Sequence, residues 1–100
     1  MNPDAGARIR DLRGLGPKSE EQLRKIGIDT PEALRAIGAV AAFIALNEKS
    51  MPRPSLNFLY ALVGAIENRD WREVAREDRD RLFAELEGRK ELRQLFGDAE

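Results

Sequence analysis

The residues with the clearest chemical potential form a short turn near the amino terminus. Two glycines stand two positions apart there, and glycine permits main-chain conformations and close approaches that other residues hinder. A helix is predicted to begin near Lys18, so its free N–H groups and positive dipole end would face the turn. A phosphate could accept hydrogen bonds from those groups, with the lysine as a nearby point charge. The candidate residues for DNA-phosphate or partner binding are Arg13, Gly14, Gly16, Pro17, Lys18 and Ser19.

Two acidic residues in the same predicted helix oppose this interpretation. Glu20 and Glu21 lie in its first turn, where carboxylates satisfy the helix dipole and would repel a phosphate that they face. In the alternative interpretation, the glycines only shape a tight turn, which then packs against a protein. In the first interpretation, the turn would bind the phosphates of the DNA backbone and would not read the base sequence. Both interpretations stay open at the level of sequence.

The sequence identifies no catalytic, cofactor or metal site. It contains no Cys and no His, which excludes Cys–His nucleophiles, imidazole bases and zinc sites with the usual ligands. Gly14-Leu15-Gly16 lacks the preceding strand and the third glycine of a nucleotide-binding fingerprint. Carboxylates such as Glu67 and Asp70 are not paired into an acid–base site by the sequence. Trp71 could stack on a base, but we expect it to close a small core at the start of a helix. These observations favour a non-enzymatic protein.

Composition indicates one small domain with nearly balanced charge. The 100 residues are 42% apolar and 35% charged, and their net charge of −1 does not favour wholesale capture of nucleic acid. Residues 1–26 hold six basic against four acidic side chains, whereas residues 61–100 hold eight against eleven. A polyanion would therefore approach the amino-terminal end. The longest apolar run, Ala39–Leu46, is far shorter than the roughly 20 residues of a membrane span, and no export signal is visible. We expect a cytoplasmic protein.

The elements that must position the turn are all predicted to be helices. Apolar residues recur at helical spacing and never in sustained alternation. We expect a short helix from about Ile9 that stops at Gly14–Pro17, and helices near 18–26, 31–37 and 39–49. After a loop at 50–54 we expect a helix capped by Ser55, another that starts at Asp70-Trp71, and a charged helix from about 78. The helix at 39–49 is apolar on most sides, which predicts a central place in the core. The fold class is therefore all-α: a small single-domain bundle of about five to seven helices over residues 1–100.

Local residue patterns predict where these helices start and stop. Gly27 is placed to end a helix in a left-handed turn. Gly88 shifts the apolar stripe of the last helix to another face, which predicts a kink or a separate helix in the charged extension at about 88–100. The predicted N-caps are Ser19 (in a capping box with Gln22), Thr30 (before Pro31), Ser55 and Asp70 (in a capping box with Glu73).

The amino-terminal turn recurs weakly 22 residues later. Leu12-Arg13-Gly14-Leu15-Gly16 aligns with Leu34-Arg35-Ala36-Ile37-Gly38. Each copy has the layout of helix, tight turn and helix, as in a helix-hairpin-helix motif, which predicts tandem helix-hairpin-helix-like units. The second copy continues into the apolar segment Ala39-Val40-Ala41-Ala42, which is predicted to be buried. Only the first copy is therefore expected to meet a polar partner.

A larger pattern of residues runs through most of the chain. Its first part consists of Leu15–Ser19, Leu23, Gly27-Ile28, Thr30, Leu34 and Ile37–Val40. Its second part consists of Ser55–Asn57, Leu59–Leu62, Gly64-Ala65 and Trp71. The combination resembles the carboxy-terminal domain of the TfoX/Sxy competence-regulator family over roughly residues 9–86. The resemblance implies an all-helical domain related to helix-hairpin-helix modules, and at the turn it extends only to Gly16, Pro17, Lys18 and Ser19.

The resemblance also implies a role in DNA uptake and in transcriptional activation of competence genes. Regulators of this family usually carry another domain before this one, whereas about eight residues precede the first helix here, so we expect a stand-alone domain. We expect it to contact a protein, either the transcription machinery or a competence regulator. The alternative is weak, sequence-independent DNA-backbone binding through the Gly14–Ser19 turn. No cofactor, metal ion or membrane is expected as a partner.

Overall fold

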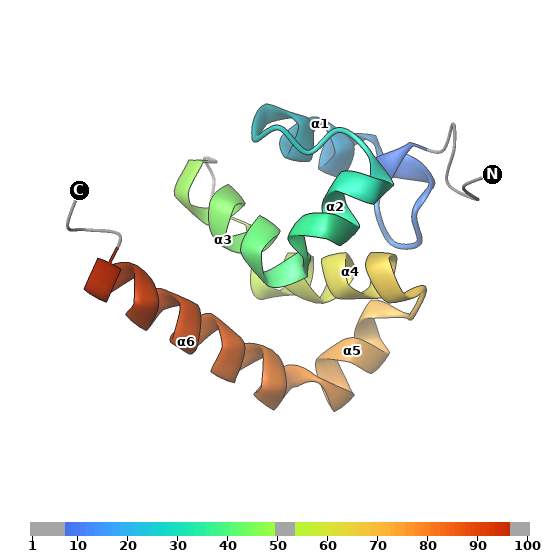
Figure 1. Cartoon of the computed structure of the whole chain (residues 1–100). Helices are drawn as coiled ribbons and strands as arrows, with labels where there is room; N and C mark the ends of the chain where they lie inside the picture. Colours follow the sequence, from blue (N-terminus) through green and yellow to red (C-terminus); the bar gives the residue numbers. More distant parts are fainter. Residues whose placement is uncertain (1–7, 50–53, 97–100) are drawn as a thin grey trace.

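The described part of the chain is built from helices alone. The computed structural model describes residues 8–49 and 54–96, with side chains as far as Arg89. Within those residues there is one 3-10 helix, six α-helices and no strand. The elements are η1 (Ile9–Asp11), α1 (Pro17–Lys25), α2 (Pro31–Ile37), α3 (Ala39–Lys49), α4 (Leu56–Glu67), α5 (Trp71–Glu77) and α6 (Arg79–Phe96) (Figure 1). The prediction of an all-α bundle of about five to seven helices is confirmed.

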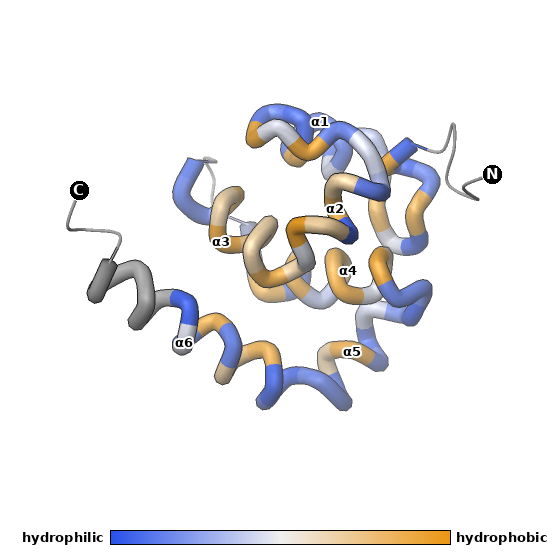
Figure 2. Tube along the Cα trace, viewed as in Figure 1, coloured by the Kyte–Doolittle hydropathy of each residue, from blue (hydrophilic) through white to orange (hydrophobic). Residues whose placement is uncertain are grey.

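A single apolar core joins the helices. Each α-helix contributes at least one almost fully buried side chain, among them Leu23, Leu34, Leu46, Leu59, Val74 and Leu82. Helix α3 packs against α1, α2, α4 and α6, which confirms its predicted central place. Apolar segments of α3 and α4 occupy the middle of the bundle in Figure 2. Full burial of one such side chain stabilises a fold by roughly 1.5–3 kcal/mol, so this core is the rigid support of the surface features described below.

Three of the predicted helix ends are confirmed. The Thr30 hydroxyl accepts a hydrogen bond from the Ala33 N–H at 3.1 Å, as an N-cap does. The Asp70 carboxylate accepts one from the Arg72 N–H at 2.8 Å. Gly27 has a φ of 89°, in the left-handed region that glycine enters without steric cost, and it ends α1.

Other predicted caps are wrong in whole or in part. Helix α1 has Gly16 as its N-cap, with Pro17 in the first helical position, so Ser19 lies inside the helix and forms no capping box. Proline fixes a helical φ and lacks the N–H that would need a partner, which moves the start ahead of Ser19. Ser55 is the N-cap of α4, but its side chain accepts no cap hydrogen bond. Glu73 lies 3.7 Å from Arg69 Nε instead of completing the predicted box with Asp70.

The connection from α4 to α5 is unusually tight. Asn68 has a left-handed φ of 55°, and the Arg69 N–H donates to the Gly64 oxygen at 2.8 Å. A Cβ atom at Gly64 would clash with the backbone oxygen of Arg69. Glycine at position 64 therefore lets the chain turn back over the end of α4 and start α5 at Trp71.

Helix α6 continues through Gly88, so the separate helix predicted as one alternative after this residue is wrong. Figure 1 shows α6 as one helix along the edge of the bundle. An exposed glycine costs a helix only about 1 kcal/mol relative to alanine. The ion pair between Glu85 and Arg89, at 3.3 Å, spans Gly88. No helix in the described residues is both long and apolar enough to span a membrane.

The two repeated turns differ in backbone conformation. The first is preceded by the short η1 and the second by the α-helix α2. Gly16, in the first turn, is extended with a φ of −131°, whereas its counterpart Gly38 has a φ of 90°. Val40 and Ala42, which follow the second turn, are buried as predicted. The predicted loop at 50–54 lies outside the described residues except for Pro54.

Candidate functional site

The Arg13–Ser19 turn is held on the surface by one apolar anchor. Leu15 is buried, and its N–H donates to the Leu12 oxygen at 3.1 Å. Gly14 next to it has a left-handed φ of 83°. Arg13, Gly14, Pro17 and Lys18 are exposed, while Gly16 and Ser19 are half-buried. The turn therefore presents most of its candidate residues to solvent.

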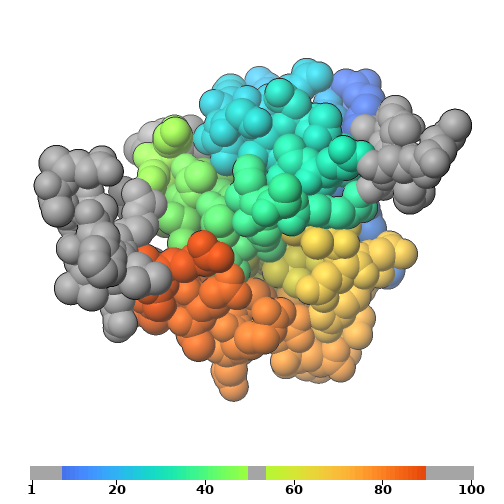
Figure 3. Space-filling model, in the orientation of Figure 1, coloured from blue at the N-terminus to red at the C-terminus, as the bar shows by residue number. Residues whose placement is uncertain are grey.

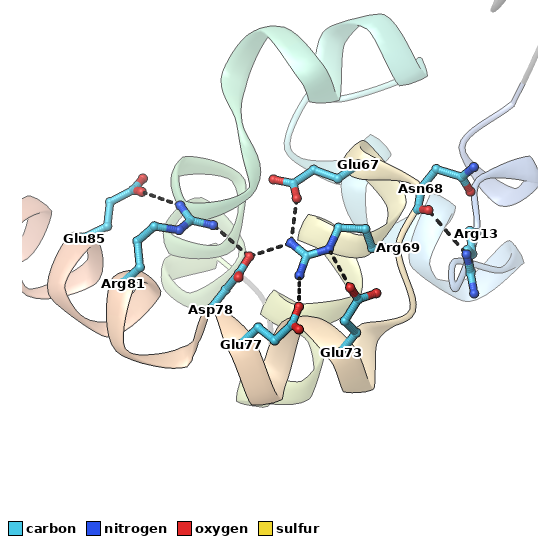
Figure 4. A network of polar contacts seen from close by, with 9 residues as sticks. All are labelled: Arg13, Glu67, Asn68, Arg69, Glu73, Glu77, Asp78, Arg81 and Glu85. Atoms are coloured by element: carbon cyan, nitrogen blue, oxygen red, sulfur yellow. Dashed lines mark hydrogen bonds and ion pairs between the residues drawn. The ribbon is translucent and has the colours of Figure 1, made fainter.

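The two basic side chains of the turn lie in different surroundings. Arg13 donates from Nη1 to the backbone oxygen of Asn68 at 3.3 Å (Figure 4). This hydrogen bond ties the turn to the connection between α4 and α5. Lys18 forms no ion pair with the residues that the structure describes, and it lies in the first turn of α1. Pro17 has no N–H, so the first turn offers a phosphate fewer backbone donors than a helix usually does. Of the two cations, Lys18 is the one unconstrained by a described partner.

Glu20 is turned into the chain and does not face the solvent. Its side chain is 3% exposed, and it binds Arg8 Nη2 and Arg10 Nη2 at 3.0 and 2.9 Å. Hydrogen bonds from the Arg10 side chain, supported by its backbone N–H and by the charges of Arg10 and Arg8, lower the pKa of Glu20 from 4.5 to about 2. The negative charge of Glu20 is therefore paired within the chain and is not directed at a phosphate bound by the turn. Glu21, in contrast, is exposed.

Sequence reasoning missed this role of Arg8 and Arg10. They lie 12 and 10 positions before Glu20, so no helical spacing connects them. The contact exists because η1 packs against α1. A buried charge requires a partner of opposite sign, yet nothing in the sequence marked Glu20 as buried.

A small cleft lies where the turn meets the start of α5. Its volume is about 190 Å³, and it is lined by Arg13, Gly14, Ala61, Arg69, Asp70 and Trp71. Trp71 is 36% exposed, so the prediction that it closes the core is wrong. Val74, one turn later, occupies the core instead, and the Arg72 guanidinium lies 5.4 Å from the centre of the Trp71 ring. The amino-terminal turn and the start of α5, which are far apart in sequence, thus share one surface with Trp71 at its edge.

Arg69, which lines this cleft, is the centre of an ion-pair network. It contacts Asp78 at 2.7 Å, Glu67 at 2.8 Å and Glu77 at 3.0 Å (Figure 4). Hydrogen bonds to Asp78 and Glu67 raise the pKa of Arg69. Hydrogen bonds from Arg69 and Arg81 lower the pKa of Asp78. The network ties the end of α4 to the junction of α5 and α6.

The carboxylates singled out from the sequence have structural roles. Glu67 binds Arg69, and Asp70 caps α5. In the described residues no group of three acidic side chains could hold a metal ion. The geometry therefore offers contact surfaces around the turn.

Comparison with known proteins identifies the family. The family model of the TfoX C-terminal domain matches residues 5–86. The DNA transformation protein TfoX of Haemophilus influenzae is 35% identical over 79 residues, which are 79% of this chain and 36% of that protein. The crystal structure of an uncharacterized protein from Listeria monocytogenes is similar with a TM-score of 0.69 and 30% identity, over 76% of this chain and 85% of the other. The resemblance expected from the sequence is confirmed: the chain belongs to the TfoX C-terminal domain family.

Proposed function

We propose that this chain is a non-enzymatic cytoplasmic interaction module in the control of DNA transformation competence, and that it acts through protein contacts. The family and the name of the Haemophilus influenzae relative support the link to competence. The chain spans 36% of that relative, so the role of the larger protein enters here as part of the proposal. Its protein partner would belong to the transcription machinery or be a competence regulator.

The exposed Trp71 beside the cleft is the observation that carries this proposal. Tryptophan and arginine side chains that border a small pocket are enriched among the residues that dominate protein–protein binding energy. Here Trp71 borders the cleft together with Arg13, and Arg72 stacks on its ring. Much of the positive charge near the turn is already paired within the chain, because Arg8 and Arg10 bind Glu20. These features suit a protein surface better than a polyanion.

A genetic and cross-linking experiment tests this proposal. Replacing the chromosomal copy with Trp71→Ala should reduce transformation frequency and competence-gene transcripts at least about tenfold, since loss of a dominant contact costs more than about 1.4 kcal/mol. Leu56→Ala is the matched control, because Leu56 is also apolar and 41% exposed but lies at the start of α4. A photo-reactive residue at position 71 should cross-link a protein that position 56 does not. Normal transformation in the Trp71→Ala strain would contradict the proposal.

The position of Lys18 favours a second candidate function, weak DNA-backbone binding through the Gly14–Ser19 turn. Lys18 is exposed in the first turn of α1, and the carboxylate of Glu20 is turned inward. With about two phosphates contacted, log affinity for duplex DNA should fall with log salt at a slope of about −1.8 between about 50 and 200 mM. Lys18→Glu should abolish this binding, whereas Lys25→Glu, at the other end of α1, should retain it. Equal binding by the two variants would remove the turn from this function.

A further inference from the structure

A second cleft has a lining that shares no residue with the cleft beside the amino-terminal turn. It lies between the α2–α3 turn, α4 and α6, and its volume is about 190 Å³. Its apolar wall is formed by Val40, Val63, Ile66 and Leu82. In Figure 3 the green surface of α2 and α3 meets the yellow surface of α4 and the orange surface of α6 on the visible face. The cleft is therefore built from three parts of the chain.

An exposed apolar residue directly precedes this cleft in the chain. Ile37 is 45% exposed and directly precedes Gly38, which lines the cleft. An isolated surface isoleucine is unremarkable in a soluble protein. An exposed isoleucine beside an apolar cleft extends the apolar contact surface, which is typical of a binding site. The size also fits, because a cavity of roughly 150 Å³ accommodates benzene, so 190 Å³ has room for one Leu- or Phe-sized side chain.

The rim of the cleft has an excess of negative charge. Glu67 on α4 and Glu85 on α6 line it, together with Arg81. These residues belong to a connected network in which five carboxylates meet three guanidinium groups. The network therefore carries two uncompensated negative charges at neutral pH. These charges would attract a cation near the mouth of the cleft.

Glu85 can accept further hydrogen bonds. Its contact with Arg81 is 4.0 Å long and its hydrogen bond from Arg89 is 3.3 Å long, both longer than a strong charge-assisted bond. A carboxylate offers about four acceptor positions. Its side chain is 38% exposed, so a cation from a partner could reach it.

We propose that this cleft docks a basic amphipathic helix of a protein partner. One aliphatic side chain of that helix enters the cleft beside Ile37, and a lysine or arginine next to it pairs with Glu85. The proposal rests on the proposed function as a protein-interaction module and adds a second contact surface with a partner of defined chemistry. A polyanion such as DNA is disfavoured here by the charge of the rim.

A peptide titration tests this assignment. The purified chain is titrated into a fluorescein-labelled Leu/Lys peptide of about 18 residues, which is about five helical turns, and into its Leu/Glu counterpart. We expect saturable binding of the basic peptide alone. Amide NMR shifts should change at the residues that line the cleft and not at the Arg13–Ser19 turn.

Two pairs of variants make the titration specific. Ile37→Gln should weaken the Kd about fivefold through lost apolar contact. Leu56 on α4 is similarly exposed, at 41% against 45%, and Leu56→Gln should leave the Kd unchanged. Glu85→Gln should weaken the Kd about threefold, whereas Glu21→Gln on α1 should not change it. Neither pair alters a buried side chain.

Several results would overturn the docking site. They are equal loss of affinity in both members of a pair, equal binding of the acidic peptide, no binding of either peptide, and self-association that covers the cleft. If the peptide fails while the Trp71 cross-link and its phenotype persist, only the cleft is rejected. If the peptide binds as expected but Trp71→Ala transforms normally, the cleft stands and the proposed Trp71 surface is rejected.

Discussion

Arg10 binds Glu20 through its main chain and its side chain together. The Arg10 N–H donates to Glu20 Oε2 at 3.2 Å, while Nε and Nη2 donate to Oε1 at 3.1 and 2.9 Å. The carboxylate thus receives three donors from one residue of η1 and a fourth from Arg8. This contact fixes η1 on α1, so it determines the direction from which the chain enters the Arg13–Ser19 turn.

The first prediction concerns the acid stability that this contact confers. Because the pKa of Glu20 is about 2 in the folded chain and near 4.5 when it is free, the unfolded state binds more protons between these values. Stability is fully present above pH 4.5 and falls as the pH drops towards 2. Glu20→Gln should lower the urea midpoint at neutral pH and reduce its slope against pH in this acidic range.

The neighbouring residue provides the control for this prediction. Glu21→Gln removes an exposed carboxylate from the same turn of α1 and should keep the wild-type slope. An unchanged acid slope in Glu20→Gln would show that the contact contributes no stability of this kind.

The second prediction compares two helical glycines. Gly64→Ala should lower the free energy of unfolding by about 1–3 kcal/mol, because the new methyl group would displace the Arg69 backbone. Gly88→Ala should raise it by about 0.5–1 kcal/mol, since position 88 has open space and alanine favours the helix. Urea unfolding followed by circular dichroism measures both. A stabilised Gly64→Ala variant would contradict the tight connection between α4 and α5.

Local signals predicted the helices well, because they depend on neighbours in sequence. The start of α2 at Thr30-Pro31 and its end at Gly38 follow from capping and from apolar spacing alone. The continuous α6 did not follow, since Gly88 resembles a break in the sequence. One glycine costs a helix only about 1 kcal/mol relative to alanine, which by itself is too little to end the helix.

The candidate site was only partly predictable. The exposed turn and Lys18 follow from the glycines and the helix start, both of which are local. The burial of Glu20, the link from Arg13 to Asn68 and the Trp71 cleft depend on tertiary packing. Arg13 and Asn68 are 55 positions apart, and no periodicity connects such a pair.

The third prediction separates a cap that forms a hydrogen bond from one that does not. Thr30→Ala should lower the free energy of unfolding by about 1 kcal/mol, because the hydroxyl accepts from Ala33. Ser55→Ala should change it by less than about 0.5 kcal/mol, since the Ser55 side chain makes no cap hydrogen bond. Equal losses in thermal or urea unfolding would show that Ser55 also caps its helix in solution.

The last prediction tests Arg69 as the centre of the network that joins α4, α5 and α6. The hydrogen bond from Arg69 is the largest cause of the lowered pKa of Asp78, and the bond from Arg81 comes second. Arg69→Gln should therefore raise the pKa of Asp78 part of the way to its ordinary value, as followed by the carboxyl carbon shift in an NMR titration. Arg81→Gln should raise it less, because it removes the smaller of the two contributions.

A nearby arginine outside the network shows whether this effect is specific. Arg76 is exposed in the last turn of α5, and Arg76→Gln removes the same charge without removing a hydrogen bond to Asp78. We expect the pKa of Asp78 to stay at its wild-type value in this variant. An equal rise in Arg69→Gln and Arg76→Gln would mean that general charge, and not the direct contact at 2.7 Å, lowers the pKa. A rise confined to Arg69→Gln and Arg81→Gln would establish that both guanidinium groups hold the start of α6 through Asp78.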